Sequence, residues 1–255
     1  MRPLLDSSEP DSFELVNATG QGDVVLVCDH ASNRIPIQLH TLGLSAQELS
    51  SHIAWDLGAF WVARYLSTRL DAPLFFSNYS RLVIDCNRNP EAGDSIPVSS
   101  AGIAIPGNQG ITPQESLRRR QSLFDPYHAA IDRLLQARAG RASFLLSIHS
   151  FTPVLQGVKR PWPLAVCYEE ASLWATRWLT ALQTQLSAAV GNNEPFQIES
   201  DVDYTIPVHV QKHGVPAIML EIRQDEICNQ AAAKNWSEII GNAWQMISSE
   251  TPIIE

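Results

Sequence analysis

The chain has few cysteines and no long apolar run. Its 255 residues include four cysteines (Cys28, Cys86, Cys167 and Cys228), and no two of them have CxxC spacing. That absence argues against a zinc ribbon and a thioredoxin-like site, so we expect reduced cysteines that serve in packing. Nowhere do about 18 apolar residues follow one another, so no membrane-spanning helix is predicted.

Positive charge is also scarce. The chain has 18 basic and 27 acidic side chains and a formal net charge of −9, which argues against a nucleic-acid or anionic-membrane partner. The first residues, MRPLLDSSEPDSFELVN, carry acidic groups where a signal peptide needs a long apolar stretch. We therefore expect a cytoplasmic protein.

Predicted strands and helices alternate along the chain after an irregular arm that ends near Gly22. Strands are predicted at 23–29, 72–79, 81–87, 142–149, 163–169, 196–200 and 216–222, and helices at 45–70, 111–140, 170–190 and 229–248. A capping box of Ser45 and Glu48 begins the first helix, Thr112 caps the second, and Pro126 should kink or split it. The alternation predicts a single α/β domain over 1–255, with three layers and a mixed, mostly parallel sheet covered by helices on both faces.

Polar side chains of ligand type follow several of these strands. His30 follows the strand at 23–29, Arg88 follows 81–87, His149 ends 142–149, and Glu221 and Arg223 lie at the end of 216–222. Ligands of open α/β folds bind at the carboxyl ends of the strands. We therefore expect these side chains to meet at one edge of the sheet.

Two histidines on separate strands that face one edge favour a metal site, although a lone histidine there is more often a capped core residue. Catalytic zinc takes three protein ligands from histidine and carboxylate groups. Our candidate for the third ligand is Asp56, in the helix at 45–70. His52, one turn earlier, could be a ligand, a partner of a ligand or a surface residue, and Asn33 is a poor zinc ligand.

Glu221 lies in an otherwise apolar strand, where a metal, an arginine or a proton must satisfy its carboxylate. Burial would raise its pKa toward the range of a general base, and the alternative is a structural pair with Arg223. Arg81, Arg88 and Arg223 suggest an anionic substrate, because guanidinium groups bind carboxylates with two hydrogen bonds. For Arg81 a salt bridge at the start of a strand is equally open.

At these residues the chain resembles the N-formylglutamate amidohydrolase family. The matching stretches are CDHASNRIP, HIAWDLGA, SRLVIDCNRNP, FDPYHAAI, LLSIHSFTP and MLEIRQDEI, which occur in the family's order over about residues 24–228. The family is similar in fold to zinc carboxypeptidases and zinc N-acetylmuramoyl amidases. The resemblance therefore implies a phosphorylase/hydrolase-like architecture.

The resemblance also implies roles for particular residues. It gives His30, Asp56 and His149 the metal, Glu221 the part of the base, and Asn87 with Arg88 the substrate carboxylate. The carboxypeptidase pattern has a glutamate three residues after its first histidine, where this chain has Asn33, so the acidic ligand is expected from Asp56. His128, in PYHAAI, is expected to line the site or to pack, with packing favoured.

The function implied is that of an amidohydrolase that uses zinc or another divalent metal. Its substrate would be a small anionic N-acyl amino acid such as N-formylglutamate, cleaved to formate and the amino acid. Two alternatives stay open, namely an amidase for another N-acyl amino acid or small peptide, and a degenerate member that binds without hydrolysing. The segment 89–110, rich in Gly, Pro and Ser, is expected to be either a lid or an ordinary surface loop.

Overall fold

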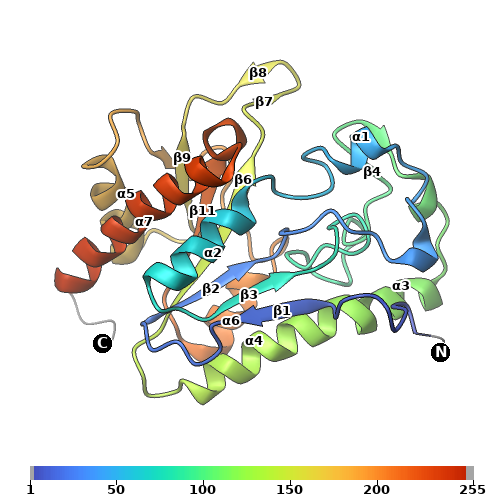
Figure 1. The fold of residues 1–255 in the computed structure, drawn as a ribbon, viewed down its shortest axis with the longest axis horizontal. Helices are drawn as coiled ribbons and strands as arrows, with labels where there is room; N and C mark the ends of the chain where they lie inside the picture. The colour runs from blue at the N-terminus through green and yellow to red at the C-terminus, as the bar shows by residue number, and fades with distance from the viewer. Residues whose placement is uncertain (1–2, 251–255) are drawn as a thin grey trace.

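The computed structural model describes residues 3–250 and is built around a seven-stranded sheet (Figure 1). In spatial order its strands are β1 (Phe13–Val16), β3 (Leu74–Ser77), β2 (Val24–Cys28), β6 (Phe144–Phe151), β11 (Ala217–Arg223), β9 (Leu164–Cys167) and β10 (Gly191–Asn192). The four central strands β3, β2, β6 and β11 are parallel to one another, whereas β1 and β9 run antiparallel to their neighbours in that group. The predicted mixed, mostly parallel sheet is therefore confirmed.

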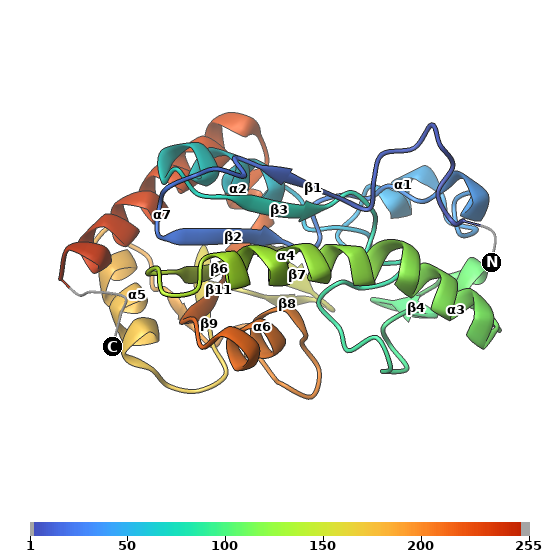
Figure 2. The same ribbon diagram turned by 90° about the horizontal axis from the view of Figure 1, so that it is seen from below.

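Helices cover both faces of the sheet (Figures 1 and 2). One face carries α2 (Ala59–Arg69), α5 (Leu173–Gln183) and α7 (Gln230–Glu250), and the other carries α4 (Asp125–Ala137) and α6 (Thr205–His213). Side chains alternate along a strand, so in β2 Val24 and Leu26 join the first core and Val25 and Val27 join the second. Within residues 3–250 no helix combines the length and the apolar character that crossing a bilayer requires.

A third apolar core lies outside the sheet, under the long connections. It supports a lobe, at the right of Figure 1, that contains α1 (Ala46–Leu49), α3 (Pro113–Arg119) and the short hairpin of β4 (Ser99–Ser100) and β5 (Ile103–Ala104). A second hairpin, β7 (Val154–Leu155) with β8 (Val158–Lys159), projects beyond the end of β6. These two projections flank the carboxyl ends of the central strands.

The two predicted helix caps, Ser45 and Thr112, are confirmed. The Ser45 side chain accepts a hydrogen bond from the Glu48 amide at 3.3 Å, and the Ser45 amide donates to the Glu48 carboxylate at 2.7 Å. Thr112 caps α3 in the same way at 3.2 Å. At Pro126 the long helix continues, because the π-helical turn Arg120–Phe124 precedes α4 and places the proline in its first turn, where no amide donor is needed.

The predicted helix at 45–70 is wrong in its middle. It consists of α1 and α2, separated by the connection 50–58. Gly58 ends this connection with a φ of +83°, and a Cβ there would come within 2.4 Å of the Ile227 carbonyl oxygen. The backbone therefore leaves helical geometry before Gly58, and Asp56 lies in a loop rather than on a helix.

Two predicted strands are absent, and several elements were not predicted: β1 and β10 of the large sheet, the short hairpin strands β4, β5, β7 and β8, and the helix α6. Residues 81–87 form turns, in which Arg81 Nη2 donates to Asp85 Oδ2 at 2.8 Å, whereas an extended chain would hold these residues roughly 13 Å apart. Residues 196–200 form a loop that turns at Glu199, whose amide donates to the Asp203 carboxylate. The predicted irregular arm contains β1.

Candidate metal and catalytic site

The three predicted metal ligands lie together. His30 follows β2, His149 lies in β6, and Asp56 comes from the connection between α1 and α2. All three are 3% exposed. One ligand atom from each lies within 4.8 Å of the others. The loop before Gly58 thus supplies the acid that pairs with two strand-end histidines.

Each histidine lies between two carboxylates. His30 Nδ1 is 3.4 Å from Asp56 Oδ2, and its Nε2 is 2.7 Å from Asp85 Oδ1. His149 Nδ1 is 2.8 Å from Asp56 Oδ2, and its Nε2 is 3.2 Å from Asp29 Oδ2. Metal-binding histidines usually present one nitrogen to the ion while a carboxylate holds the other. With a metal bound, Asp56 could thus be a ligand shared by both histidines, and Asp85 and Asp29 could hold the two rings.

The chemical surroundings of His30, Asp56 and His149 suit a divalent cation. His30 Nδ1 is buried without a hydrogen-bond partner. Burial would raise the pKa of Asp56, but the two histidines outweigh it and hold this pKa well below its usual range. Burial would lower the pKa of His149, but Asp29 and Asp56 raise it well above its usual value. The pocket thus stabilises positive charge beside an ionised carboxylate, and two nitrogens with one carboxylate match the donors that zinc prefers.

Asp29 and Asp85, whose carboxylates contact the two histidine rings, were not predicted as site residues. Asp29 Oδ1 accepts hydrogen bonds from Tyr127 at 2.8 Å and Thr205 at 2.9 Å. Asp85 accepts from the Asn87 amide at 2.8 Å and from Arg81 at 2.8 Å. Both acids occur in the matching stretches, Asp29 directly before His30 and Asp85 two residues before Asn87. A metal-bound histidine usually has a carboxylate partner on its other nitrogen, and this rule could have identified both acids in the sequence.

Glu221 lies next to the metal candidates through strand register. It pairs with His149 across the parallel strands β11 and β6, so both side chains point to the same face of the sheet. Glu221 is 7% exposed, and its Oε2 has no hydrogen-bond partner. Burial raises its pKa to about 7. The side chain is thus held near the candidate metal site in a state that can accept a proton near neutral pH.

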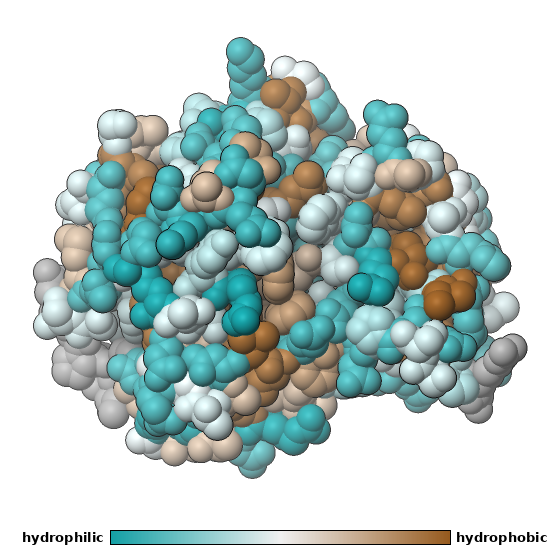
Figure 3. Space-filling view, viewed as in Figure 1, coloured by the Kyte–Doolittle hydropathy of each residue, from teal (hydrophilic) through white to brown (hydrophobic). Residues whose placement is uncertain are grey.

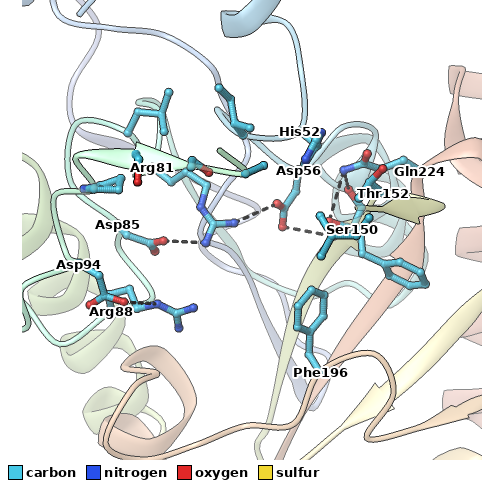
Figure 4. A pocket seen from close by; sticks show the side chains of 18 of the residues that line it. His52, Asp56, Arg81, Asp85, Arg88, Asp94, Ser150, Thr152, Phe196 and Gln224 are labelled. Carbon is cyan, nitrogen blue, oxygen red and sulfur yellow. Dashed lines mark hydrogen bonds and ion pairs between the residues drawn. The ribbon is translucent and has the colours of Figure 1, made fainter. Parts of the chain in front are cut away.

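Two adjoining cavities meet at this centre. One, of about 310 Å³, contains His30, His149, Glu221 and Asn87. The other, of about 430 Å³, extends past His52, Thr152 and Gln224 (Figure 4). Residues lining both are Asp56, Arg81, Arg88, Ser150 and Phe196. In Figure 3 the outline of the molecule is indented between the β7–β8 hairpin and the lobe that carries α1 and β4.

The predicted substrate-binding residues differ in their surroundings. Arg81 lines both cavities and contacts Asp85 at 2.8 Å and Asp56 at 3.6 Å (Figure 4). Arg88 also lines both and donates to Asp203 at 2.7 Å. Asn87 lines the smaller cavity, but its side-chain oxygen accepts from two backbone amides, those of residues 204 and 205. Asn87 therefore shapes the loop around Asp203.

Arg223, which was expected to bind substrate, lines neither of the two cavities. Its guanidinium donates to Asp225 at 2.7 Å, to Glu226 at 2.9 Å, and to the carbonyls of Arg160 at 3.1 Å and Pro161 at 2.9 Å. It lies at the end of β11 but braces the segment that leads into β9. Arg160, in that segment, lines the larger cavity, and it was missed because it follows no predicted strand end.

The remaining predicted residues also have defined places. His52 lines the larger cavity, and its Nε2 is buried without a partner. The Asn33 side chain donates to the Leu49 carbonyl at 2.9 Å and so braces a loop. His128 Nε2 lies 2.7 Å from the Cys86 carbonyl, and its ring stacks on that of His209. These are the contacts of a packed side chain, the role favoured for His128. Residues 97 and 99–101, in the predicted lid, form one wall of the larger cavity; closure stays a prediction.

Comparison with known proteins identifies the family. A model of the N-formylglutamate amidohydrolase family matches residues 22–228. The chain belongs to this family. Among curated proteins none matches the chain significantly in sequence.

Solved structures with the same fold were also found. A gene product from Agrobacterium tumefaciens is 37% identical with a TM-score of 0.89, over 96% of this chain and 99% of that chain. An N-formylglutamate amidohydrolase from Ralstonia eutropha JMP134 is 17% identical with a TM-score of 0.62, over 94% and 98%. A bacteriophage poly-gamma-glutamate hydrolase is 10% identical with a TM-score of 0.50, over 96% and 94%. The last two share the fold of this amidohydrolase.

Proposed function

We propose that this amidohydrolase is a metal-dependent enzyme that hydrolyses the amide bond of a small anionic N-acyl amino acid. N-formylglutamate, the substrate in the family's name, is the representative of that class, and its products are formate and glutamate. The observation that carries the proposal is the meeting of His30, Asp56 and His149 beside Glu221.

His30, His149 and Asp56 would hold a divalent metal such as Zn²⁺, with Asp85 and Asp29 fixing the two rings. When bound, such a metal supplies a water of lowered pKa and polarises a carbonyl oxygen. The removal of His149 should therefore abolish metal binding.

Glu221 would act as the base. Its carboxylate would accept a proton from the attacking water and pass that proton to the leaving nitrogen, as one group can do in both steps. Its Oε2 is buried and free of hydrogen bonds. Burial keeps the pKa of this carboxyl near 7, which favours transfer in both directions.

Arg81 and Arg88 would handle negative charge. Arg81 is fixed by Asp85 and Asp56 at the junction of the two cavities, so it would stabilise charge that develops on the carbonyl oxygen. Arg88 lines both cavities and would bind a carboxylate of the amino-acid half, which we place in the smaller one. Asp203 shares this guanidinium and would fix its orientation.

The test is hydrolysis by the zinc-loaded protein of N-formyl, N-acetyl and longer N-acyl derivatives of glutamate, aspartate and leucine, with release of the free amino acid measured. We expect turnover of acidic amino-acid derivatives in preference to the leucine derivative. Arg88→Gln should lower kcat/KM for the acidic substrates ~10–100-fold, the loss of a charged hydrogen bond. Absence of turnover with every N-acyl amino acid, in a protein that holds its metal, would contradict the proposal.

A further inference from the structure

The larger cavity is more than a formyl group needs. An amide bound at the catalytic centre has two arms, and two cavities leave that centre. If Arg88 binds the amino-acid arm in the smaller cavity, the acyl arm points into the larger one, of about 430 Å³. A formyl group is of the order of a water molecule, which takes about 30 Å³ in the liquid, so most of this cavity would stay without substrate.

Arg160 gives the larger cavity a cation that has no ion pair with a described carboxylate. Arg81 and Arg88, the other arginines of this wall, each form an ion pair within 3 Å, with Asp85 at 2.8 Å and Asp203 at 2.7 Å. For Arg160 no ion pair with a carboxylate is found among residues 3–250, and its guanidinium reaches only the Thr152 carbonyl at 3.5 Å. A buried or half-buried charge without a partner is costly, and an anionic ligand would compensate it.

The guanidinium of Arg160 is held in place before any ligand binds. Its central carbon lies 4.9 Å from the ring centre of Phe196 and 5.6 Å from that of Phe151, so two aromatic faces contact it. Arg223 donates to the Arg160 carbonyl at 3.1 Å and fixes the backbone. An arginine restrained in this way loses little conformational entropy when it binds a carboxylate.

His52 adds a second polar group in the same cavity. Its Nε2 is buried and has no hydrogen-bond partner among the described residues, although most buried polar atoms have one. Burial lowers the pKa of His52, and Arg160 and Arg81 lower it further, so the ring stays neutral and can donate one hydrogen bond. Arg160 and His52 thus line the same cavity as a charged and a neutral polar group.

We propose that the larger cavity binds the acyl arm of the substrate and that Arg160, with His52, selects an acyl group that ends in a carboxylate. The substrate class is then the half-amide of a dicarboxylic acid with an amino acid. Hydrolysis adds one water across the amide and releases the dicarboxylate and the free amino acid. The assignment rests on the proposed function, because it takes the catalytic centre and the amino-acid arm from there.

The test compares N-formyl-, N-acetyl-, N-succinyl- and N-glutarylglutamate with the zinc-loaded wild type, Arg160→Gln and Lys159→Ala. Lys159 is exposed and lies in β8 next to Arg160, outside both cavities, so it controls for the loss of one positive charge. We expect wild-type kcat/KM to be at least ~10-fold higher for the succinyl or glutaryl substrate than for the formyl one. Arg160→Gln should lower that value ~10–100-fold while changing the formyl value less than ~3-fold.

An equilibrium binding measurement gives a readout independent of turnover. In a calorimetric titration, succinate or glutarate should bind to the wild type and to Lys159→Ala more tightly than acetate does, and Arg160→Gln should lose that preference. Hydrolysis of the formyl substrate without any preference for the dicarboxylic series would overturn this inference and leave the proposed function standing. The inference would also be overturned if the loss of kcat/KM in Arg160→Gln depended on the carboxylates of the amino-acid arm and not on the acyl carboxylate. Failure with every substrate of the panel would overturn the proposed function itself.

Discussion

Replacement of Glu221 by glutamine removes the proton-accepting oxygen while keeping the size of the side chain. General-base catalysis by a positioned side chain contributes roughly 10²- to 10⁴-fold to a rate. We therefore expect Glu221→Gln to lower kcat by at least ~100-fold. Because Glu221 is not one of the proposed ligands, the variant should bind zinc as the wild type does.

The same substitution should stabilise the metal-free protein at neutral pH. Glu221 is 7% exposed, and burial raises its pKa from 4.5 to about 7. As pH rises from 4.5 to 7, the unfolded chain releases this proton before the folded protein does, so the free energy of unfolding falls. A shift of this size corresponds to about 3 kcal/mol at most, and Glu221→Gln should recover it above pH 7 but not at pH 4.5.

Steady-state hydrolysis and urea unfolding of the metal-free protein between pH 5 and 7.5 measure both effects. Glu170→Gln, at an exposed position, is the matched control and should change neither kcat nor the pH dependence of stability. The reasoning is refuted if Glu221→Gln keeps more than a tenth of the wild-type kcat. It is also refuted if wild type and variant respond alike to pH.

Three further perturbations follow from particular contacts. Asp85→Asn weakens the 2.7 Å contact with His30 Nε2 and should lower zinc affinity ~10- to 100-fold in a chelator competition; unchanged affinity would remove Asp85 from the site. Gly58→Ala places a Cβ 2.4 Å from the Ile227 carbonyl at a φ of +83° and should destabilise by at least ~1–2 kcal/mol in urea unfolding; a neutral effect would show that the loop adapts. Burial lowers the pKa of His209 to about 3 and that of His128 to about 4, so the unfolded chain takes up protons first as pH falls below 6.5; His209→Gln should reduce the loss of stability between pH 6.5 and 5 by up to about 2 kcal/mol, and an unaltered loss would contradict the assigned burial effect.

Sequence patterns predicted the sheet because its central strands are short apolar runs buried on both faces. The carboxyl-end rule then predicted that His30, His149 and Glu221 would meet, since parallel strands end at one edge. It could not give the register of β6 and β11, which sets Glu221 directly beside His149. That pairing depends on tertiary packing of both strands.

Asp56 and residues 81–87 show where periodicity fails. The apolar spacing around Asp56 fits a helix, but the approach of Gly58 to the Ile227 carbonyl, far along the chain, interrupts it. Residues 81–87 are apolar enough for a strand, yet bonds from Asp85 to Arg81 and His30 fold them into turns. A close backbone approach in the first place and polar contacts of the site in the second override local propensity.

The arginines were the least predictable residues. Arg223 was chosen because it ends a strand two residues after Glu221. The chain turns directly after Arg223, and its guanidinium bonds to Asp225 and Glu226 instead. Arg160 comes directly after the β7–β8 hairpin, whose two strands have two residues each. Strands this short give no signal in the sequence. Only the folded path of the chain between β6 and β9 brings it to the larger cavity.

The most direct test of the account is the metal content of purified wild type and of His149→Ala, measured by elemental analysis after zinc addition and dialysis. We predict about one zinc per wild-type chain and its loss in His149→Ala, since three protein ligands are needed to hold a catalytic zinc. Lys159→Ala should retain the metal. Wild-type protein that holds no zinc or other divalent metal would contradict the central claim.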